Sequence, residues 1–265
     1  MDKRLAKSFI HRLFCMFRAK KSLGQNFLVN QGILDKIINA ADLNKKDIVL
    51  EIGSGTGVLT KKLTENAGRI VAVEKDRRLI EELREKFRNT NIEIVEGDIL
   101  KFQPTIYNLK PTTYKVVGNI PYYLTSNLLR KIFEDWPQPK LIILTMQKEV
   151  AQRIIAKPPR MNLLALSIQF YTEPKIISYV SRGSFRPMPK VDSAIIRLTP
   201  YQESRIMNYE LREKFFKLTK TAFAGKRKQL KNTIGAEILE KTGLRPESRP
   251  EELSLEDWLQ ITSQV

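Results

Sequence analysis

A short apolar strand that runs directly into a glycine-rich turn and then into a helix limits what this chain can fold into. Residues 48–52 read as the strand, Gly53, Gly55 and Gly57 form the turn, and residues 58–65 have helical spacing. The same order of strand and helix then recurs, with further strands predicted at 69–73, 92–95, 114–117 and 141–145. Such alternation indicates a parallel sheet covered on both faces, so we predict an α/β, Rossmann-like fold.

Acidic residues follow the predicted strands at the edge of the sheet where ligands of such folds bind. Glu74 ends the second strand, where a carboxylate can accept hydrogen bonds from ribose hydroxyls. Asp98 ends the third strand, where it can accept from an adenine amino group. The turn reads G-x-G-x-G, and Val58 stands where a dinucleotide fingerprint needs its third glycine. The pattern therefore predicts a nucleoside site without a diphosphate, and S-adenosylmethionine is a ligand of this kind.

The segment Asn119-Ile120-Pro121-Tyr122, after the fourth strand, suits the methylation of an adenine amine. That amine is a poor nucleophile because its lone pair is delocalised into the ring. The side-chain oxygen of Asn119 and the carbonyl of Ile120 can accept its two hydrogens and free the lone pair. Pro121 would stiffen the turn, and Tyr122 offers a ring on which an extruded base can stack. An Asx turn followed by core tyrosines is the alternative, which the neighbouring nucleoside site disfavours.

A formal net charge of +17 favours a polyanionic partner, with nucleic acid ahead of a membrane. Residues 1–21 hold seven of the basic residues and are predicted to form a basic N-terminal arm. A membrane-surface helix, an organelle transit peptide and a solvated terminus are the alternatives for this arm. No apolar run approaches the ~20 residues of a membrane span. A single cysteine, Cys15, suits a reducing, cytoplasmic compartment, and one His with one Cys argues against a metal site.

Taken together, these motifs resemble the KsgA family, the ribosomal RNA adenine dimethyltransferases. The matching segments run from about residue 20 to the C-terminus and are 22–28, 51–57, 73–74, 97–98, 118–122, 146–151, 185–193 and 223–228. The resemblance implies that two adjacent adenosines in a hairpin loop near the 3′ end of small-subunit rRNA are each dimethylated at N6. It also implies S-adenosylmethionine as methyl donor, a monomeric enzyme, and an assembling ribosomal subunit as partner.

The resemblance assigns roles to individual residues of this sequence. It places the cofactor against Gln25, Asn26, Leu28, Gly53, Gly55, Glu74, Lys75, Asp98, Ile99 and Asn119. Asn119 would touch both cofactor and target amine, and Phe185 would cover the face of the base opposite Tyr122. Two departures stand out: residues 156–162 lack the glycine that this loop usually carries, and Tyr123 stands where relatives often have Asn. We expect no role for Tyr123.

A domain boundary is predicted near Pro200, because the pattern after it is helical only. Residues 22–200 would form the catalytic, S-adenosylmethionine-binding domain, and residues 201–265 a small all-helical domain that binds rRNA. Near the basic residues at 214–231 of this domain, only Glu210 and Glu213 offset the positive charge in the sequence, so phosphate contacts are favoured over a merely solvated helix face. The expected contacts, on what reads as a helix start, are Lys226, Arg227, Lys228 and Lys231.

Two other functions fit parts of the pattern. An Erm-type enzyme, which dimethylates one adenosine of large-subunit rRNA, shares the Asn-Ile-Pro-Tyr segment. Residues 185–193 and 223–228 favour the small-subunit enzyme instead. A mitochondrial relative, either an rRNA methyltransferase or a non-catalytic transcription factor, would fit the basic arm. The intact set of Asn119, Pro121 and Tyr122 speaks against lost catalysis.

Overall fold

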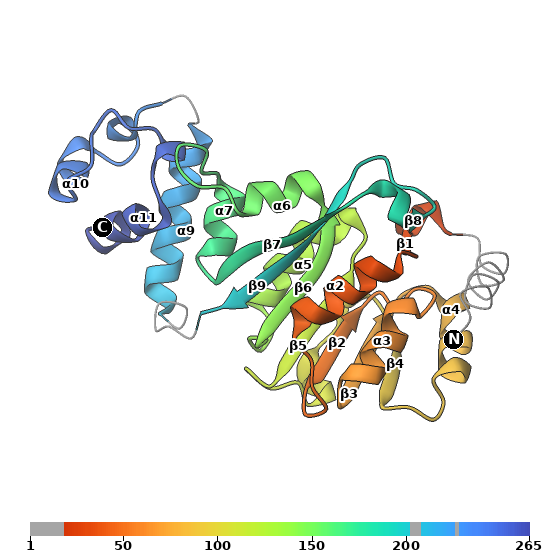
Figure 1. Cartoon of the computed structure of the whole chain (residues 1–265). Coiled ribbons are helices and arrows are strands. Elements are labelled where there is room, and N and C mark those ends of the chain that lie inside the picture. The colour runs from red at the N-terminus through yellow and green to blue at the C-terminus, as the bar shows by residue number, and fades with distance from the viewer. Residues whose placement is uncertain (1–18, 202–207, 226–227) are drawn as a thin grey trace. The chain divides into compact units, whose positions relative to one another are not determined.

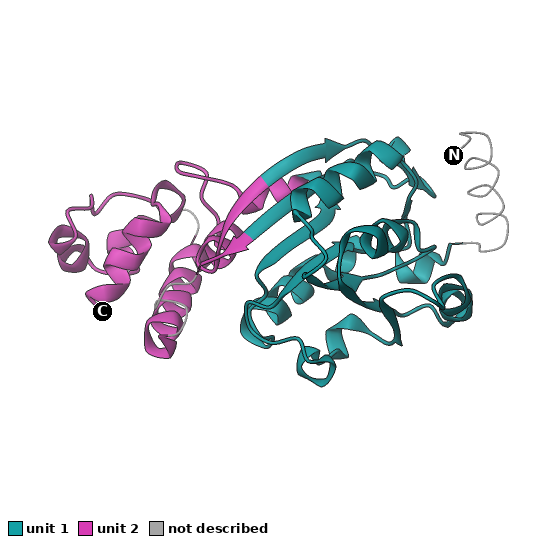
Figure 2. Cartoon of the chain, turned by 60° about the horizontal axis from the view of Figure 1, so that its bottom comes forward, with its two compact units in different colours: residues 1–148, 176–198 teal, residues 149–175, 199–265 magenta. Residues whose placement is uncertain are grey.

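The computed structural model describes residues 19–201, 208–225 and 228–265 (Figure 1). The predicted basic arm, residues 1–21, therefore lies outside the described residues except for its last three. The contacts between residues divide the chain into two compact units (Figure 2). The first contains residues 1–148 and 176–198, and the second contains residues 149–175 and 199–265.

A seven-stranded sheet with the order β4-β3-β2-β5-β6-β9-β7 is the centre of the fold (Figure 1). Its strands are β2 (Ile48–Ile52), β3 (Arg69–Glu74), β4 (Ile92–Glu96), β5 (Tyr114–Asn119), β6 (Leu141–Gln147), β7 (Thr172–Val180) and β9 (Ser193–Pro200). The pairs β2–β3, β2–β5, β3–β4 and β5–β6 are parallel, and β9 runs antiparallel to β6. This topology confirms the predicted α/β, Rossmann-like sheet, and it brings the carboxyl ends of β2 to β5 to one edge.

Helices cover both faces of the sheet, with α2 and α3 in front of it and α5 behind it in Figure 1. The helices of this part are α2 (Gln31–Ala41), α3 (Val58–Asn66), α4 (Arg77–Lys86) and α5 (Thr125–Glu134). The apolar residues of α2 recur at helical spacing and are buried, among them Leu34 and Ile37. Because both faces are covered, the residues of β2, β3, β5 and β6 are almost all buried.

One buried charge ties the centre of the sheet to the end of α2. The ammonium of Lys115, on β5, donates to the carbonyls of Ala41 at 3.1 Å and Asp42 at 2.6 Å. It also pairs with the Asp47 carboxylate at 3.0 Å, and its side chain is only 5% exposed. All three of its N–H groups are thereby satisfied, and two carbonyls at the helix C-terminus gain a donor. Lys115 is therefore a structural residue.

The second unit has a core of its own, made largely by helices. They are α7 (Leu163–Gln169), α9 (Tyr209–Ala224), α10 (Ala236–Lys241) and α11 (Leu255–Ser263), and most of α6 (Lys148–Ile154) belongs here as well. The rings of Phe170 and Phe215 lie 4.7 Å apart between centroids, so the chain after α7 packs against α9. This packing groups residues 149–175 with the C-terminal helices, whereas the predicted boundary near Pro200 placed them with the catalytic domain. The roles given to the predicted domains stay predictions.

Across the described ranges 19–201, 208–225 and 228–265, no helix is both long enough and apolar enough to cross a bilayer.

Candidate active site

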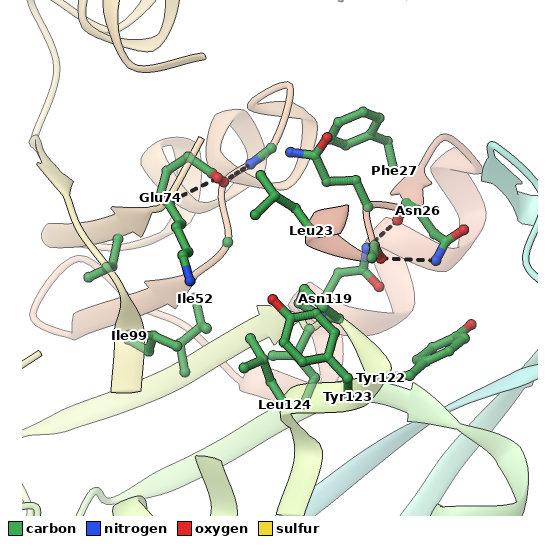
Figure 3. Close-up of a pocket in the computed structure, with 18 of the residues that line it drawn as sticks. Leu23, Asn26, Phe27, Ile52, Glu74, Ile99, Asn119, Tyr122, Tyr123 and Leu124 are labelled. Carbon is green, nitrogen blue, oxygen red and sulfur yellow. Dashed lines mark hydrogen bonds between the residues drawn. The ribbon is translucent and has the colours of Figure 1, made fainter. Parts of the chain in front are cut away.

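A pocket opens at the carboxyl edge of the sheet, where segments far apart in the sequence meet (Figure 3). Its lining comes from residues 23–27, the ends of β2 to β5 and the turns that follow them, and Phe185. Of the predicted site residues, the pocket brings together Gln25, Asn26, Gly53, Gly55, Glu74, Lys75, Asp98, Ile99, Asn119, Ile120, Pro121, Tyr122 and Phe185. Leu28 is not among its lining residues. It is 5% exposed, packs in the hydrophobic core, and borders a smaller cavity beside Gly53.

The glycine turn requires a glycine at position 55, because of both its backbone conformation and the small space around it. This residue has a φ of +55°, which side chains other than glycine rarely adopt, and a Cβ built there would lie 2.9 Å from Cδ1 of Phe27. Its N–H donates to Oε2 of Glu74 at 2.9 Å. The turn is thus locked between the N-terminal segment above it and the carboxylate at the end of β3.

Glu74 is held by backbone donors on both of its oxygens. Besides Gly55, the N–H groups of Lys75 at 2.9 Å and Asp76 at 2.8 Å donate to its Oε1. Burial raises the pKa of Glu74 above its usual value, although these three backbone N–H groups oppose the rise. A carboxylate has about four acceptor positions. The three bonds therefore fix the orientation of Glu74 and leave its Oε2 able to accept again, facing the pocket.

Asp98 and Lys75 form an ion pair at the pocket rim, with 2.7 Å between Nζ and Oδ2. Burial alone would raise the pKa of Asp98, but hydrogen bonds from Lys75 and from the N–H of Leu100 outweigh it and lower the pKa. Asp98 is therefore an anion at neutral pH, held at the end of β4. The side chain of Lys75 is 51% exposed at the rim, and its ammonium contacts the carboxylate of Asp98.

The carboxylate of Asp76 joins the N-terminal segment to the end of β3. The side chain of Gln25 donates to its Oδ2 at 2.9 Å, while Oε1 of Gln25 accepts from the N–H of Lys20 at 2.7 Å. The guanidinium of Arg78 donates to both oxygens of Asp76 and holds its pKa well below the usual range. Both ends of the Gln25 amide are thus engaged inside the protein. The sequence pattern gave Asp76 no signal beyond its position before a helix.

The amide of Asn119 has a defined orientation, because its Nδ2 donates to the backbone carbonyl of Asn26 at 2.9 Å. With the nitrogen so engaged, Oδ1 is the atom that can accept a hydrogen from a ligand. The side chain of Asn26 in turn donates to the carbonyl of Gly24 at 3.2 Å. The N-terminal segment therefore positions the residue on which the predicted chemistry depends.

Two aromatic side chains on this side of the pocket are held by distant segments, one of them through a short sheet that the sequence did not predict. In it β1 (Phe27–Leu28) pairs antiparallel with β8 (Phe185–Arg186), with Leu28 opposite Phe185. Phe185 is 1% exposed. The hydroxyl of Tyr122 lies 2.7 Å from that of Ser193, the first residue of β9. Both rings are thereby held in place at the pocket.

Tyr123, for which no role was expected, also lines the pocket. In Figure 3 its ring points toward the side where Glu74 and Ile99 lie, while that of Tyr122 points away from it. A Cβ built on Gly24 would lie 3.1 Å from the Tyr123 ring, so the two close one wall together. The other unpredicted lining residues are mostly apolar, and they are Leu23, Phe27, Ile52, Val73 and Leu124, with Gly24 and Gly97. An apolar residue at a strand end carries no sequence signal that separates pocket from core.

The predicted RNA-binding cluster is only partly described. Lys226 and Arg227 lie outside the described residues, Lys228 is exposed, and Lys231 lies in the short 3-10 helix η6 (Leu230–Asn232), after α9 has ended at Ala224. The expectation of few acidic neighbours was wrong for Lys231, whose ammonium lies 3.4 Å from the carboxylate of Glu247. That pair joins residues 16 positions apart, so the local sequence could not indicate it.

Known proteins resemble this chain over most of its length. Residues 16–265 match the family model described as Ribosomal RNA adenine dimethylase. A relative from Dehalococcoides mccartyi (strain 195), called Ribosomal RNA small subunit methyltransferase A, is 41% identical over 91% of this chain and 86% of its own. A protein of the same name from Rippkaea orientalis is 41% identical over 94% of this chain and 98% of its own.

Two solved structures share the whole fold. The 23S rRNA methyltransferase ErmE has a TM-score of 0.77 and 28% identity, covering 90% of this chain and 99% of its own. A dimethyladenosine transferase from Plasmodium falciparum has a TM-score of 0.76 and 30% identity, covering 89% of this chain and 95% of its own. The chain thus belongs to the ribosomal RNA adenine dimethylase family of S-adenosylmethionine-dependent rRNA methyltransferases.

Proposed function

We propose that this enzyme dimethylates N6 of two adjacent adenosines in a hairpin loop near the 3′ end of small-subunit rRNA. It acts as a monomer, in the cytoplasm, on a ribosomal subunit that is still assembling. The observation that carries the chemistry is the Asn119 amide, whose nitrogen is engaged by the Asn26 carbonyl so that its oxygen faces a ligand as an acceptor.

The residues of the pocket fit S-adenosylmethionine. Glu74, with backbone donors on both oxygens and a free acceptor position on Oε2, suits the ribose hydroxyls. Asp98, kept anionic by Lys75, suits the adenine amino group. Apolar side chains such as Ile52 and Ile99 offer surfaces to an adenine ring. When bound, this cofactor supplies an electrophilic methyl group.

The protein's task in the reaction is to make the target amine a better nucleophile. Oδ1 of Asn119 and the carbonyl of Ile120 accept the two N–H hydrogens, which localises the lone pair on N6. No strong base is required, because the nitrogen becomes acidic only after it is methylated. Tyr122, held by Ser193, and the buried Phe185 provide aromatic surface for the extruded base.

The small subunit is favoured over the large one by the relatives. The proteins named for the small subunit reach 41% identity, whereas ErmE, named for 23S rRNA, has 28%. Residues 185–193 and 223–228 support the same choice, because their sequences resemble the small-subunit enzymes rather than the Erm-type enzymes.

Primer extension across rRNA from a strain that lacks this gene tests the proposal. Two adjacent stops near the 3′ end of small-subunit rRNA should be absent and should return when the wild-type gene is supplied. Asn119→Ala, supplied in the same way, should fail to restore them. Stops that persist in the deletion strain would overturn the proposal, and methyl incorporation into large-subunit rRNA alone by the purified protein would support the Erm-type alternative.

A further inference from the structure

The loop between β8 and β9 carries an exposed apolar side chain at a place where solvent should favour a polar one. Met188 is 57% exposed and stands between Pro187 and Pro189, of which Pro189 is buried. Val191, three residues on, is 44% exposed. Prolines fix the backbone φ, so the thioether is presented on a stiff segment whose anchor is Pro189.

Both ends of this loop are attached to the pocket for the target base. At its start, Phe185 lines the pocket and pairs with β1. At its end, Ser193 bonds to the hydroxyl of Tyr122 at 2.7 Å. The guanidinium of Arg186 closes the start of the loop by donating to the carbonyls of Gly183 at 3.0 Å and Phe185 at 2.8 Å. Met188 thus stands on a short loop whose two ends are held by contacts to the pocket, one through Phe185 and the other through the bond from Ser193 to Tyr122.

The charges around Met188 suit a nucleic acid strand. Arg182 lies just before β8, Arg186 ends β8 and Lys190 lies on the loop, and all three are exposed. The nearby acid, Asp192, is engaged, since its Oδ1 accepts from the N–H of Arg182 at 3.0 Å. Exposed cations of this kind bind phosphates and position a strand, while an apolar side chain among them can contact only bases.

We propose that Met188 is a wedge that enters the RNA stack beside the target adenosine and fills the place the base leaves. Unbranched, polarizable methionine adapts to aromatic faces, and apolar side chains inserted between bases unstack them. The inference rests on the proposed function, because the stacked partner is the nucleotide next to the methylated adenosine. It gives the loop 185–193 two tasks: Phe185 holds the extruded base, and Met188 keeps the stack from closing behind it.

Single-turnover methylation of small subunits isolated from the deletion strain tests the wedge. Met188→Ala should lower the rate at saturating subunit and cofactor about tenfold, the equivalent of ~1.4 kcal/mol and within the range of stacking one base. The dissociation constant for the subunit should change less than about twofold, on the same conversion. Met188→Leu should restore most of the rate. Ile106→Ala is the matched control, because Ile106 is 69% exposed on another surface of the same unit, and it should behave as wild type.

The outcomes separate the wedge from other roles. An undiminished rate in Met188→Ala, equal losses of rate and affinity, or a leucine variant as slow as the alanine variant would each overturn the proposal. A wild-type protein that methylates no small subunit at all would instead overturn the proposed function, before any variant is compared.

Discussion

Replacing Glu51 with glutamine should make the stability of this protein less dependent on pH. Glu51 lies at the end of β2, is fully buried, and accepts one hydrogen bond, from Thr60 at 2.7 Å. Its other oxygen, Oε1, has no partner among the described residues. Burial raises its pKa from the ordinary 4.5 to about 7, against the opposing effect of the Thr60 hydroxyl.

The change in stability with pH has the opposite sign to that caused by an ordinary ion-paired acid. The folded state holds the Glu51 proton more tightly than the unfolded state, so the free energy of unfolding falls as the pH rises from about 4.5 to about 7. The full difference corresponds to about 3 kcal/mol. Between pH 5 and pH 8, wild type should lose about 2 kcal/mol relative to Glu51→Gln, whose side chain has a similar shape and no charge to desolvate.

Urea unfolding at pH 5, 6, 7 and 8 measures this difference, followed by circular dichroism and, in a Trp258→Phe background, by the fluorescence of buried Trp136. Trp136 lies in the same unit as Glu51. Glu93→Gln, at a half-exposed position of β4, is the matched control and should run parallel to wild type. The reasoning would be refuted if the free energies of unfolding of wild type and Glu51→Gln changed equally with pH. It would also be refuted if wild type became more stable relative to the variant as the pH rises.

Three further substitutions test the site and its support. Asn119→Ala should lower kcat by ~100-fold or more, the usual cost of removing one positioned hydrogen-bonding group from a reaction centre. Calorimetry should find much less change in cofactor affinity, and a near-normal kcat would contradict its role as acceptor. Asp76→Ala releases Gln25 and should raise the Kd for S-adenosylmethionine about tenfold, because hydrogen bonds to charged groups contribute ~1.5–3 kcal/mol. An unchanged Kd would mean that the contact does not hold the N-terminal segment. Lys115→Met leaves the buried Asp47 carboxylate without its cationic partner, with only Asn44 among the described residues donating to it, and should cost ~3–5 kcal/mol in urea unfolding, whereas a loss below ~1 kcal/mol would show that the site relaxes.

Local patterns in the sequence were sufficient to predict which strand ends and turns meet at the site. Strands and helices have distinct apolar spacings, and parallel strands place their carboxyl ends at one edge, so Gly53, Glu74, Asp98 and Asn119 could be predicted to lie near one another. The capping box of α11 at Ser254 and Asp257 is local in the same sense, since its partners are three residues apart.

The contacts that complete the site depend on pairing between distant segments. Nothing in residues 25–28 shows that Gln25 will meet Asp76 or that Leu28 will lie opposite Phe185, because the pairing of β1 with β8 follows from how two loops pack. The position of Tyr123 against Gly24 arises in the same way.

The sequence by itself determined the parallel sheet, the edge at which the pocket lies and the groups that we propose to carry the chemistry. Each of these follows from spacing within one strand, helix or turn. Only the tertiary structure decided how those groups are held: the amide of Asn119 is oriented by the carbonyl of Asn26, and the carboxylate of Glu74 is fixed by three N–H groups. It also decided the burial of Glu51, one of whose oxygens has no partner in the described part of the chain. Orientation, burial and pKa depend on which atoms come together from distant segments, and spacing along the chain does not encode that.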